Sequence, residues 1–170
     1  MEPLLASAVA EVRPGRALDL ACGLGRNALY LAERGWLVTA LDYSAVAIES
    51  LSGRSIDARV VDLEDPAFRL PVSEYDLVVD ILYLQRSLFQ QIRNALRPGG
   101  IFAGVIAMFD GDPNVVPMNA DYLCQPGELR MVFADWTIRH YHEGKGHRRN
   151  VAEIIAERPW HDGDGSPLQL

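Results

Sequence analysis

The 170-residue sequence is poor in cysteine and contains only Cys22 and Cys124. They form no closely spaced pair, which excludes a disulfide framework and a CxxC metal or redox motif. No apolar run approaches the roughly 18 residues of a membrane-spanning helix. Basic residues are also in deficit, with 16 Lys and Arg against 23 Asp and Glu and a net charge of -7. We therefore expect a cytoplasmic protein that binds neither nucleic acid nor membrane.

The chain also lacks internal repeats, low-complexity tracts and linkers, which favours a single domain. We expect this domain to cover residues 1–159. The last segment, WHDGDGSPLQL, has little apolar surface to bury, so residues 160–170 are expected to form a flexible tail. The N-terminal MEPLLASAVAEV carries Glu2 and Glu11 and no basic leader, so it predicts a short surface helix and not a signal peptide.

Short apolar runs alternate with helical patterns, which predicts crossover units in a doubly wound, mostly parallel α/β sheet. The expected strands cover residues 17–21, 36–41, 58–63, 75–81 and 101–108, followed by an antiparallel pair over 136–141 and 150–157. Helices are expected over 26–34, after Ser44 with Ala45, Ile48 and Leu51 buried, after Ser87, and over 127–134. Two prolines leave no room for a helix between the third and fourth strands.

Aspartates lie at the ends of three predicted strands: Asp19 in the first, Asp42 after the second and Asp62 in the third. In an open parallel sheet, the carboxyl ends of adjacent strands face one crevice at the point where strand order reverses. We therefore predict that the three carboxylates line one pocket. Asp42 follows Gly23 by 19 residues, close to the spacing of roughly 20 at which a carboxylate binds a ribose.

A glycine-containing loop, residues 21–25, follows the first strand and lets the backbone approach a ligand closely. The next helix begins at Arg26 and Asn27, where free N–H groups can receive an anion. The pattern G-x-G-x-x-A from Gly23 also fits a nicotinamide-dependent oxidoreductase, which stays an alternative. Asp19 argues against it, because a carboxylate before the loop repels a pyrophosphate and attracts an ammonium group. A ligand that carries an amine, a carboxylate and an adenosine fits better.

Five segments occur in the order DLACGLGRNALYLAERG, LDYS, VDLED, EYDLVV and LRPGG. They resemble the successive motifs of the class I S-adenosylmethionine-dependent methyltransferases. Within that family, CGLGRNALYLA is similar to the tellurite-resistance methyltransferases, small enzymes that act on small acceptors. The resemblance implies a Rossmann-like, seven-stranded sheet with an antiparallel C-terminal edge hairpin. It also implies direct in-line transfer of the methyl group of S-adenosylmethionine to a small-molecule acceptor, with S-adenosylhomocysteine as product.

The resemblance also assigns roles to the strand-end residues. Asp19 would bind the methionine amino group, and Asp42 would hold the ribose hydroxyls. Tyr43 would cover one face of the adenine. Asp62 would contact the adenine amine, with the Leu63 backbone nearby.

The same resemblance places the loop over residues 21–25 against the methionyl part of the cofactor. Asp80 and Ile81 would face the methionine moiety and the transferred methyl group. Ala21 departs from the glycine that the family more often has, which we expect to weaken nothing severely. The expected cofactor-binding residues are Asp19, Ala21, Cys22, Gly23, Gly25, Arg26, Asn27, Asp42, Tyr43, Asp62, Leu63, Asp80 and Ile81.

Catalytic side chains are harder to identify, because methyl transfer from a sulfonium needs mainly positioning. Tyr83 and Arg86 are the candidates for catalysis or substrate contact; the alternatives are a packing role for Tyr83 and a surface charge for Arg86. His140, His142 and His147 invite a metal hypothesis, but no cysteine or carboxylate completes a ligand set, so we expect no metal site.

The residues leave several alternatives open. A protein that binds S-adenosylmethionine as a sensor or scaffold, without turnover, would keep the same pocket. A DNA adenine or cytosine N-methyltransferase is disfavoured, because the fourth strand ends in Asp80-Ile81-Leu82-Tyr83 and not in Asp/Asn-Pro-Pro-aromatic. The acceptor atom is open between oxygen, nitrogen, sulfur and a metalloid oxyanion. A second copy of the chain could complete the acceptor pocket, which leaves a homodimer open.

Overall fold

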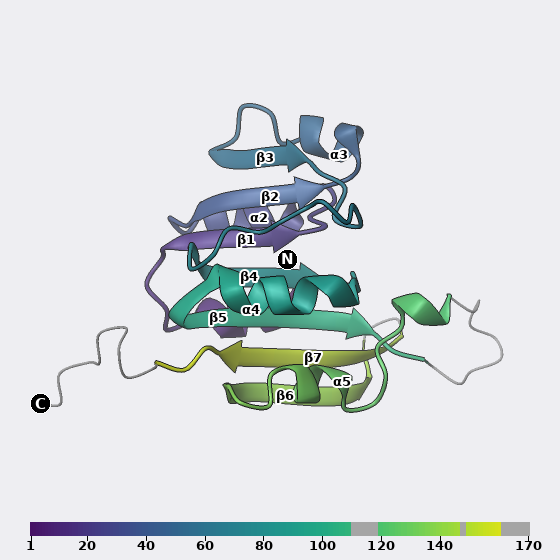
Figure 1. Cartoon of the computed structure of the whole chain (residues 1–170). Helices are drawn as coiled ribbons and strands as arrows, with labels where there is room; N and C mark the ends of the chain where they lie inside the picture. The colour runs from purple at the N-terminus through teal and green to yellow at the C-terminus, as the bar shows by residue number, and fades with distance from the viewer. Residues whose placement is uncertain (110–118, 147–148, 161–170) are drawn as a thin grey trace, which may run out of the picture.

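A computed structural model describes residues 1–109, 119–146 and 149–160 of the chain. Seven strands form one sheet in the order β3-β2-β1-β4-β5-β7-β6 (Figure 1). The first five pair in parallel, while β7 pairs antiparallel with β5 and β6. The strands are β1 (Arg16–Leu20), β2 (Leu37–Asp42), β3 (Ile56–Val60), β4 (Tyr75–Ile81), β5 (Leu96–Ala107), β6 (Thr137–Lys145) and β7 (Asn150–Glu157). The predicted doubly wound sheet with its antiparallel edge hairpin is confirmed.

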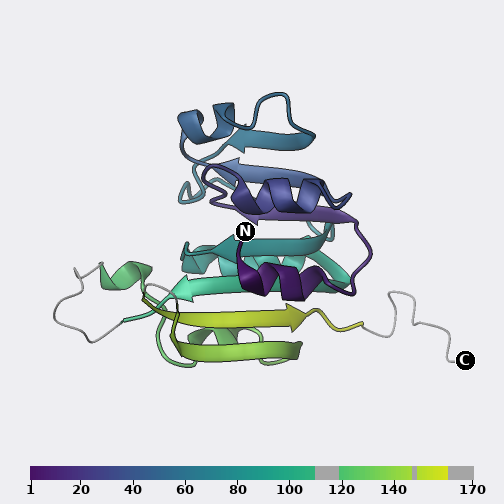
Figure 2. The ribbon, with the colours of Figure 1, turned by 180° about the vertical axis from the view of Figure 1, so that it is seen from behind.

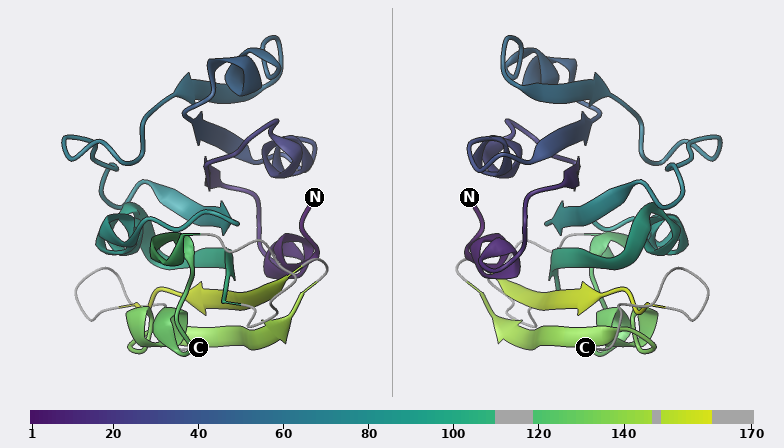
Figure 3. Two further views of the ribbon diagram at one scale, coloured as in Figure 1. Left: turned by 90° about the vertical axis from the view of Figure 1, so that its right-hand side faces the viewer. Right: turned by 90° about the vertical axis from the view of Figure 1, so that its left-hand side faces the viewer.

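Helices cover both faces of the sheet (Figure 3). They are α1 (Pro3–Val9), α2 (Arg26–Ala32), α3 (Ala45–Glu49), α4 (Phe89–Ala95) and α5 (Glu128–Val132), with short 3-10 turns at η1 (Arg86–Leu88) and η2 (Ala120–Tyr122). Figure 2 shows α1 and α2 on one face, and Figure 1 shows α4 and α5 on the other. Each face buries its own apolar cluster, since successive strand residues point to opposite sides. Strand order reverses between β1 and β4, which places the switch point of the sheet there.

The third strand ends earlier than predicted. β3 covers Ile56–Val60 and pairs with β2 along its whole length. The N–H of Val61 still donates to the Asp42 carbonyl, but Asp62 then accepts a hydrogen bond from the Glu64 N–H at 2.9 Å and turns the chain away. Asp62 therefore lies in a turn after the strand and not at its last position.

Two helix predictions also need correction. Ser44 caps α3 as predicted and Leu51 is buried, but Ile48 is only half-buried, and Ala47 is buried in place of the exposed Ala45. Ser87 caps no helix: it lies within η1, and α4 begins only at Phe89.

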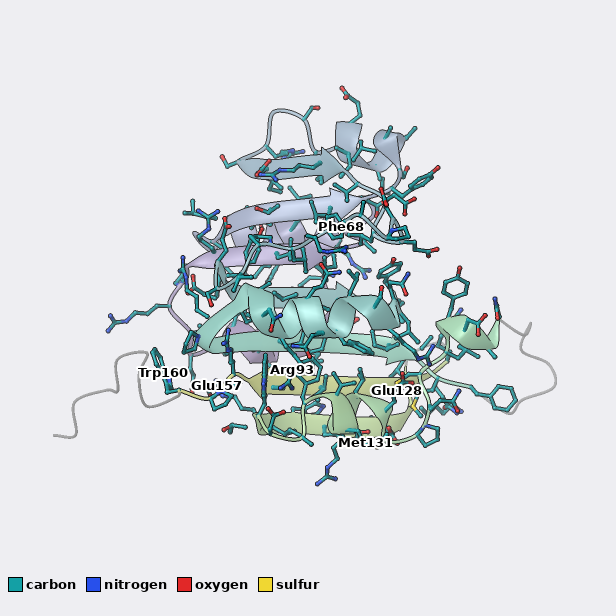
Figure 4. The ribbon with its side chains drawn as sticks, in the orientation of Figure 1. Phe68, Arg93, Glu128, Met131, Glu157 and Trp160 are labelled. Carbon is teal, nitrogen blue, oxygen red and sulfur yellow. The ribbon has the colours of Figure 1, made fainter. Side chains whose placement is uncertain are left out.

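No crossover helix connects β3 to β4, as the two prolines predicted. Instead Leu63 and Leu70 are buried, and Phe68 packs against the same apolar cluster (Figure 4). At the far end of the chain, Trp160 packs over Gly99, where an added Cβ would lie 2.5 Å from the indole ring (Figure 4). The rest of the predicted tail, residues 161–170, lies outside the described residues. None of the helices in the described ranges has the length and apolarity needed to cross a membrane.

Candidate functional site

Asp42 organises the loop that follows β1. Its Oδ2 accepts a hydrogen bond from the Gly23 N–H at 2.7 Å, and its Oδ1 accepts one from the Ser44 N–H at 2.8 Å. The carboxylate thus ties the glycine loop to the start of α3 and keeps lone pairs free for further donors. Gly25 adopts a φ of 72°, and a Cβ there would lie 2.4 Å from the side chain of Leu51. The loop therefore requires glycine at this position for both conformation and space.

Ala21 is more strained than the sequence suggested. It lies directly after β1 with a φ of 49°, in the left-handed region where a Cβ costs about 1 to 2 kcal/mol. The next residue fixes this turn, because the Cys22 N–H donates to the Leu41 carbonyl at 3.0 Å. The sheet therefore holds Ala21 in a conformation that glycine would adopt without strain.

A cavity of about 450 Å³ opens beside this loop. Its walls come from the loop after β1, the end of β2, the turn after β3 and the turn after β4. The lining residues are Ala21, Asp42, Tyr43, Val61, Asp62, Leu63, Glu64 and Tyr83. The cavity thus brings together Tyr83 and five of the predicted cofactor-binding residues: Ala21, Asp42, Tyr43, Asp62 and Leu63. Val61 and Glu64 were not predicted, although both belong to the VDLED motif, residues 61–65, that also contains Asp62.

Two further carboxylates, those of Asp19 and Asp80, are almost completely buried at the ends of β1 and β4. Within the described residues, Asp19 Oδ2 and Asp80 Oδ1 have no hydrogen-bond partner. Asp19 pairs with Ala40 in the sheet and therefore shares a face with Asp42, whereas Asp80 pairs with Leu20 and points to the other face. Neither residue lines the 450 Å³ cavity, so only two of the three predicted strand-end carboxylates line it.

Burial governs the protonation of both carboxyl groups. Burial is the largest cause that raises the pKa of Asp19 to about 7. A hydrogen bond from the Ala28 backbone lowers this pKa, and the charge of Asp42 raises it. Burial likewise raises the pKa of Asp80 well above its usual range, and the charge of Asp19 adds to this effect. An unpaired buried carboxylate is costly, so without a positively charged neighbour both groups favour the neutral, protonated form.

The two cysteines are not activated nucleophiles. Burial, followed by the charges of Asp19 and Asp42, raises the pKa of the Cys22 thiol to about 12. Burial also raises the pKa of the Cys124 thiol to about 12, with Glu128 as the next cause. Reactive thiols require a lowered pKa, so both behave as small packing residues.

The structure separates the two catalytic candidates. Tyr83 lines the 450 Å³ cavity, and burial, with the charges of Glu64 and Asp80 next, raises the pKa of its hydroxyl. Arg86 instead makes an ion pair with Glu128, in which Nε lies 2.6 Å from Oε1. Its other nitrogens donate to the carbonyls of Asp121 and Leu123 and to Glu128 Oε2. Arg86 does not line this cavity and joins η1 to the start of α5, where Figure 4 labels Glu128.

A second cavity, of about 820 Å³, lies on the other side of the turn after β4. Its lining residues are Met1, Glu2, Pro3, Leu4, Arg26, Leu82, Val105, Gly146, Arg149, Val151 and Glu153. The N-terminal segment is fixed beside it, because the Glu2 N–H donates to the buried Asn27 side chain at 3.0 Å. Ile81, predicted to face the cofactor, is half-buried against the cluster under α1 and α2.

The two histidines that the structure describes, His140 and His142, do not gather into a metal site. His140 Nε2 lies 3.3 Å from Glu153 Oε2, and His142 is exposed on the same strand, β6. His147 lies outside the described residues. Across residues 1–109, 119–146 and 149–160, no group of three or more His, Cys, Asp or Glu side chains is placed to hold a metal ion.

Comparison with known proteins places this architecture in a family. Residues 3–154 match the family model of the tellurite resistance protein TehB. Hemagglutinin 1 of Eikenella corrodens is 30% identical over 177 residues, covering 96% of this chain and 54% of that protein. A probable S-adenosyl-L-methionine-dependent methyltransferase, TehB of Haemophilus influenzae, is 25% identical over 84% of this chain and 53% of its own length.

Solved structures show the same fold. The crystal structure of TehB from Haemophilus influenzae superposes with a TM-score of 0.79 at 24% identity, over 93% of this chain and 62% of that one. The chain spans about half the length of the relatives it matches in sequence. The resemblance to the tellurite-resistance branch of the class I S-adenosylmethionine-dependent methyltransferases is confirmed. With the family model matching residues 3–154, the chain belongs to the TehB family.

Proposed function

We propose that the chain binds S-adenosylmethionine and transfers its methyl group to a small-molecule acceptor. One observation carries the proposal. The cavity lined by Asp42 lies near the buried carboxylate of Asp19, whose Oδ2 has no hydrogen-bond partner among the described residues. A nucleoside and a cation are the two ligand parts that such neighbours attract. S-adenosylmethionine joins both in one molecule.

The residues fit this cofactor group by group. Asp42 accepts hydrogen bonds from the ribose hydroxyls, and the exposed ring of Tyr43 stacks on the adenine. Asp62 accepts a hydrogen bond from the adenine amine beside the Leu63 backbone. Asp19 attracts the methionine ammonium group, because its buried Oδ2 lacks a donor among the described residues.

The remaining predicted residues surround the methionine part. The loop over residues 21–25 and the first N–H groups of α2, at Arg26 and Asn27, border it. Asp80 and Ile81 lie at the end of β4, where the neighbouring sulfonium would be placed. When bound, the cofactor supplies an electrophilic methyl group, and the chain orients the acceptor and excludes water. Such positioning is worth about 7 to 11 kcal/mol in favourable cases.

A small acceptor is supported by charge and by space. The net charge of -7 disfavours binding to nucleic acid, although one relative is named as a ribosomal RNA methyltransferase. Another relative is named as a malonyl-[acyl-carrier protein] O-methyltransferase, so a carrier-bound acceptor is the second candidate. The 820 Å³ cavity beside Leu82 has the size of a small-molecule site. A solved neighbour from Burkholderia thailandensis holds 1,6-didemethyltoxoflavin and S-adenosylhomocysteine, which is a small acceptor with the same cofactor product.

Two measurements test the proposal. Calorimetric titrations with S-adenosylmethionine, S-adenosylhomocysteine and NADH should show binding of the first two only; binding of NADH alone would point to the oxidoreductase alternative. A screen for S-adenosylhomocysteine release with small thiols, amines, carboxylates and tellurite should then find turnover. Cofactor binding without turnover on any acceptor, including an acyl-carrier protein, would favour the sensor or scaffold alternative.

A further inference from the structure

The second cavity, of about 820 Å³, is separated from the 450 Å³ cavity by the turn that follows β4, at Leu82 and Tyr83. Tyr83 lines the smaller cavity, and Leu82 lines the larger one. Leu82 achieves this with a φ of 62°, an unusual conformation for a bulky residue, held by a hydrogen bond from its N–H to the Val105 carbonyl at 2.6 Å. A strained residue that neighbouring structure holds in place is a reason to look for a functional role.

The wall of this cavity has an apolar and a charged part. The apolar part includes Leu4, Leu82, Val105 and Val151, of which Leu82 is 56% exposed. Leu82 is therefore a large apolar side chain beside the carboxyl end of β4 that a bound molecule could cover. Aliphatic walls favour an occupant with an apolar body, and a cavity of this size is typical of organic ligands. A bare metalloid oxyanion would leave most of it filled with water.

The charged part contains Arg26 and Arg149 together with Glu2 and Glu153. Glu153 Oε2 lies 3.3 Å from His140 Nε2. Among the residues that the structure describes, Arg26 makes no ion pair or side-chain hydrogen bond, and it is exposed. A guanidinium group is suited to bidentate binding of a carboxylate or phosphate. An anion is also the better neighbour for a sulfonium, because a second cation would be repelled.

We infer that the second cavity is the acceptor site and that it takes an organic anion, with its apolar body against Leu82 and Val105 and its acidic group at Arg26. This inference rests on the proposed function, because it identifies the substrate class of that same reaction. It differs from methylation of a bare oxyanion, which would use neither the aliphatic wall nor the volume.

Binding of non-reacting probes tests the inference without requiring turnover. Benzoate, phenylacetate and indole-3-acetate, each paired with its neutral amide, are titrated into the protein saturated with S-adenosylhomocysteine and followed by ligand-observed NMR. Acetate is the control that carries the carboxylate without an aromatic group, and tellurite is the control for a bare oxyanion. At least one aromatic carboxylate should bind about tenfold more tightly than its amide and than acetate. Methyl resonances of Leu82 and Val105 should shift on binding.

Variants assign the two halves of the site. Arg26→Gln should remove the preference for the carboxylate over its amide. The control Arg34→Gln should keep it, because Arg34 is the second residue after α2 and its guanidinium lies over the Tyr30 ring. Leu82→Ala should weaken carboxylate and amide alike, by about fivefold. Saturating cofactor product corrects for any change in cofactor affinity in each variant.

The outcomes separate the two proposals. If no carboxylate in the panel is preferred over its amide, or if tellurite displaces the probes as strongly as they displace one another, the inference about the acceptor is wrong. If S-adenosylhomocysteine itself fails to bind in a separate titration, the proposed function is wrong, and the probes then report on the cavity alone.

Discussion

The buried carboxyl group of Asp19 makes a testable link between stability and cofactor binding. Burial raises its pKa from 3.8 to about 7, so the folded protein holds a proton that the unfolded chain releases at lower pH. The resulting stabilisation is complete below pH 3.8 and is lost as the pH rises through about 7. A shift of about 3 pKa units corresponds to about 4 kcal/mol in total, of which about 3 kcal/mol is lost between pH 5 and pH 8.

Asp19→Asn should abolish this pH dependence, because an amide stays neutral. We expect urea denaturation to show that the free energy of unfolding of the wild type falls about 3 kcal/mol more than that of the variant between pH 5 and pH 8. Asp80 titrates in both proteins, so the difference between the two curves reports on Asp19 and on its repulsion with Asp80. Glu49→Gln, an exposed carboxylate in α3, controls for the loss of one negative charge.

The same substitution should weaken binding of S-adenosylmethionine at pH 8, since it removes the carboxylate proposed for the ammonium group. If Asp19→Asn is more stable than the wild type at pH 8 but binds the cofactor less tightly, the Asp19 carboxylate lowers stability and contributes to cofactor binding. Two parallel pH curves for the wild type and Asp19→Asn would refute the electrostatic reasoning. Unchanged affinity with altered stability would refute only the cofactor role.

Three further substitutions test other parts of the site. Asp42→Ala should lower cofactor affinity by about 1 to 3 kcal/mol in calorimetry, because it removes charge-assisted hydrogen bonds; unchanged affinity would count against the ribose role. Gly25→Ala should destabilise the protein by more than about 2 kcal/mol in urea, since the new Cβ meets Leu51 at a positive φ; a neutral effect would contradict this geometry. Arg86→Lys should lower the melting temperature by a few degrees by breaking the bidentate pair with Glu128 while turnover of the remaining folded protein is kept; selective loss of turnover would restore the catalytic hypothesis.

Local patterns predicted much of the fold. The apolar run Tyr75–Ile81 became β4 without change, and Ser44 caps α3 through a hydrogen bond from the Ala47 N–H. The pocket beside Asp42 was also accessible to prediction, because the chemistry of a strand end followed by a glycine loop depends on short spacing along the chain. The shortened third strand follows from turn chemistry, because the Asp62 side chain accepts a hydrogen bond from the Glu64 N–H.

Long-range pairing explains what the sequence could not predict. The partners of Arg86 lie 35 to 42 residues away, so their proximity depends on how α5 packs and not on any local pattern. The faces of Asp19 and Asp80 depend on the register between β1 and β4, which the alternation within each strand does not determine. The second cavity likewise joins the N-terminal segment to the edge hairpin, two parts of the chain whose contact is set only by the fold.

The strained residues at the switch point connect these observations. Ala21 follows β1 with a φ of 49° and Leu82 follows β4 with a φ of 62°, so the chain leaves both neighbouring strands in a left-handed conformation. Each turn is held by a backbone hydrogen bond to the adjoining strand, one from the Cys22 N–H to Leu41 and one from Leu82 to Val105. Because the buried sheet stabilises the protein far more than the roughly 1 to 2 kcal/mol that each left-handed residue costs, the strain can persist. The two turns border different cavities, so the sheet itself sets the separation between the proposed cofactor and its acceptor.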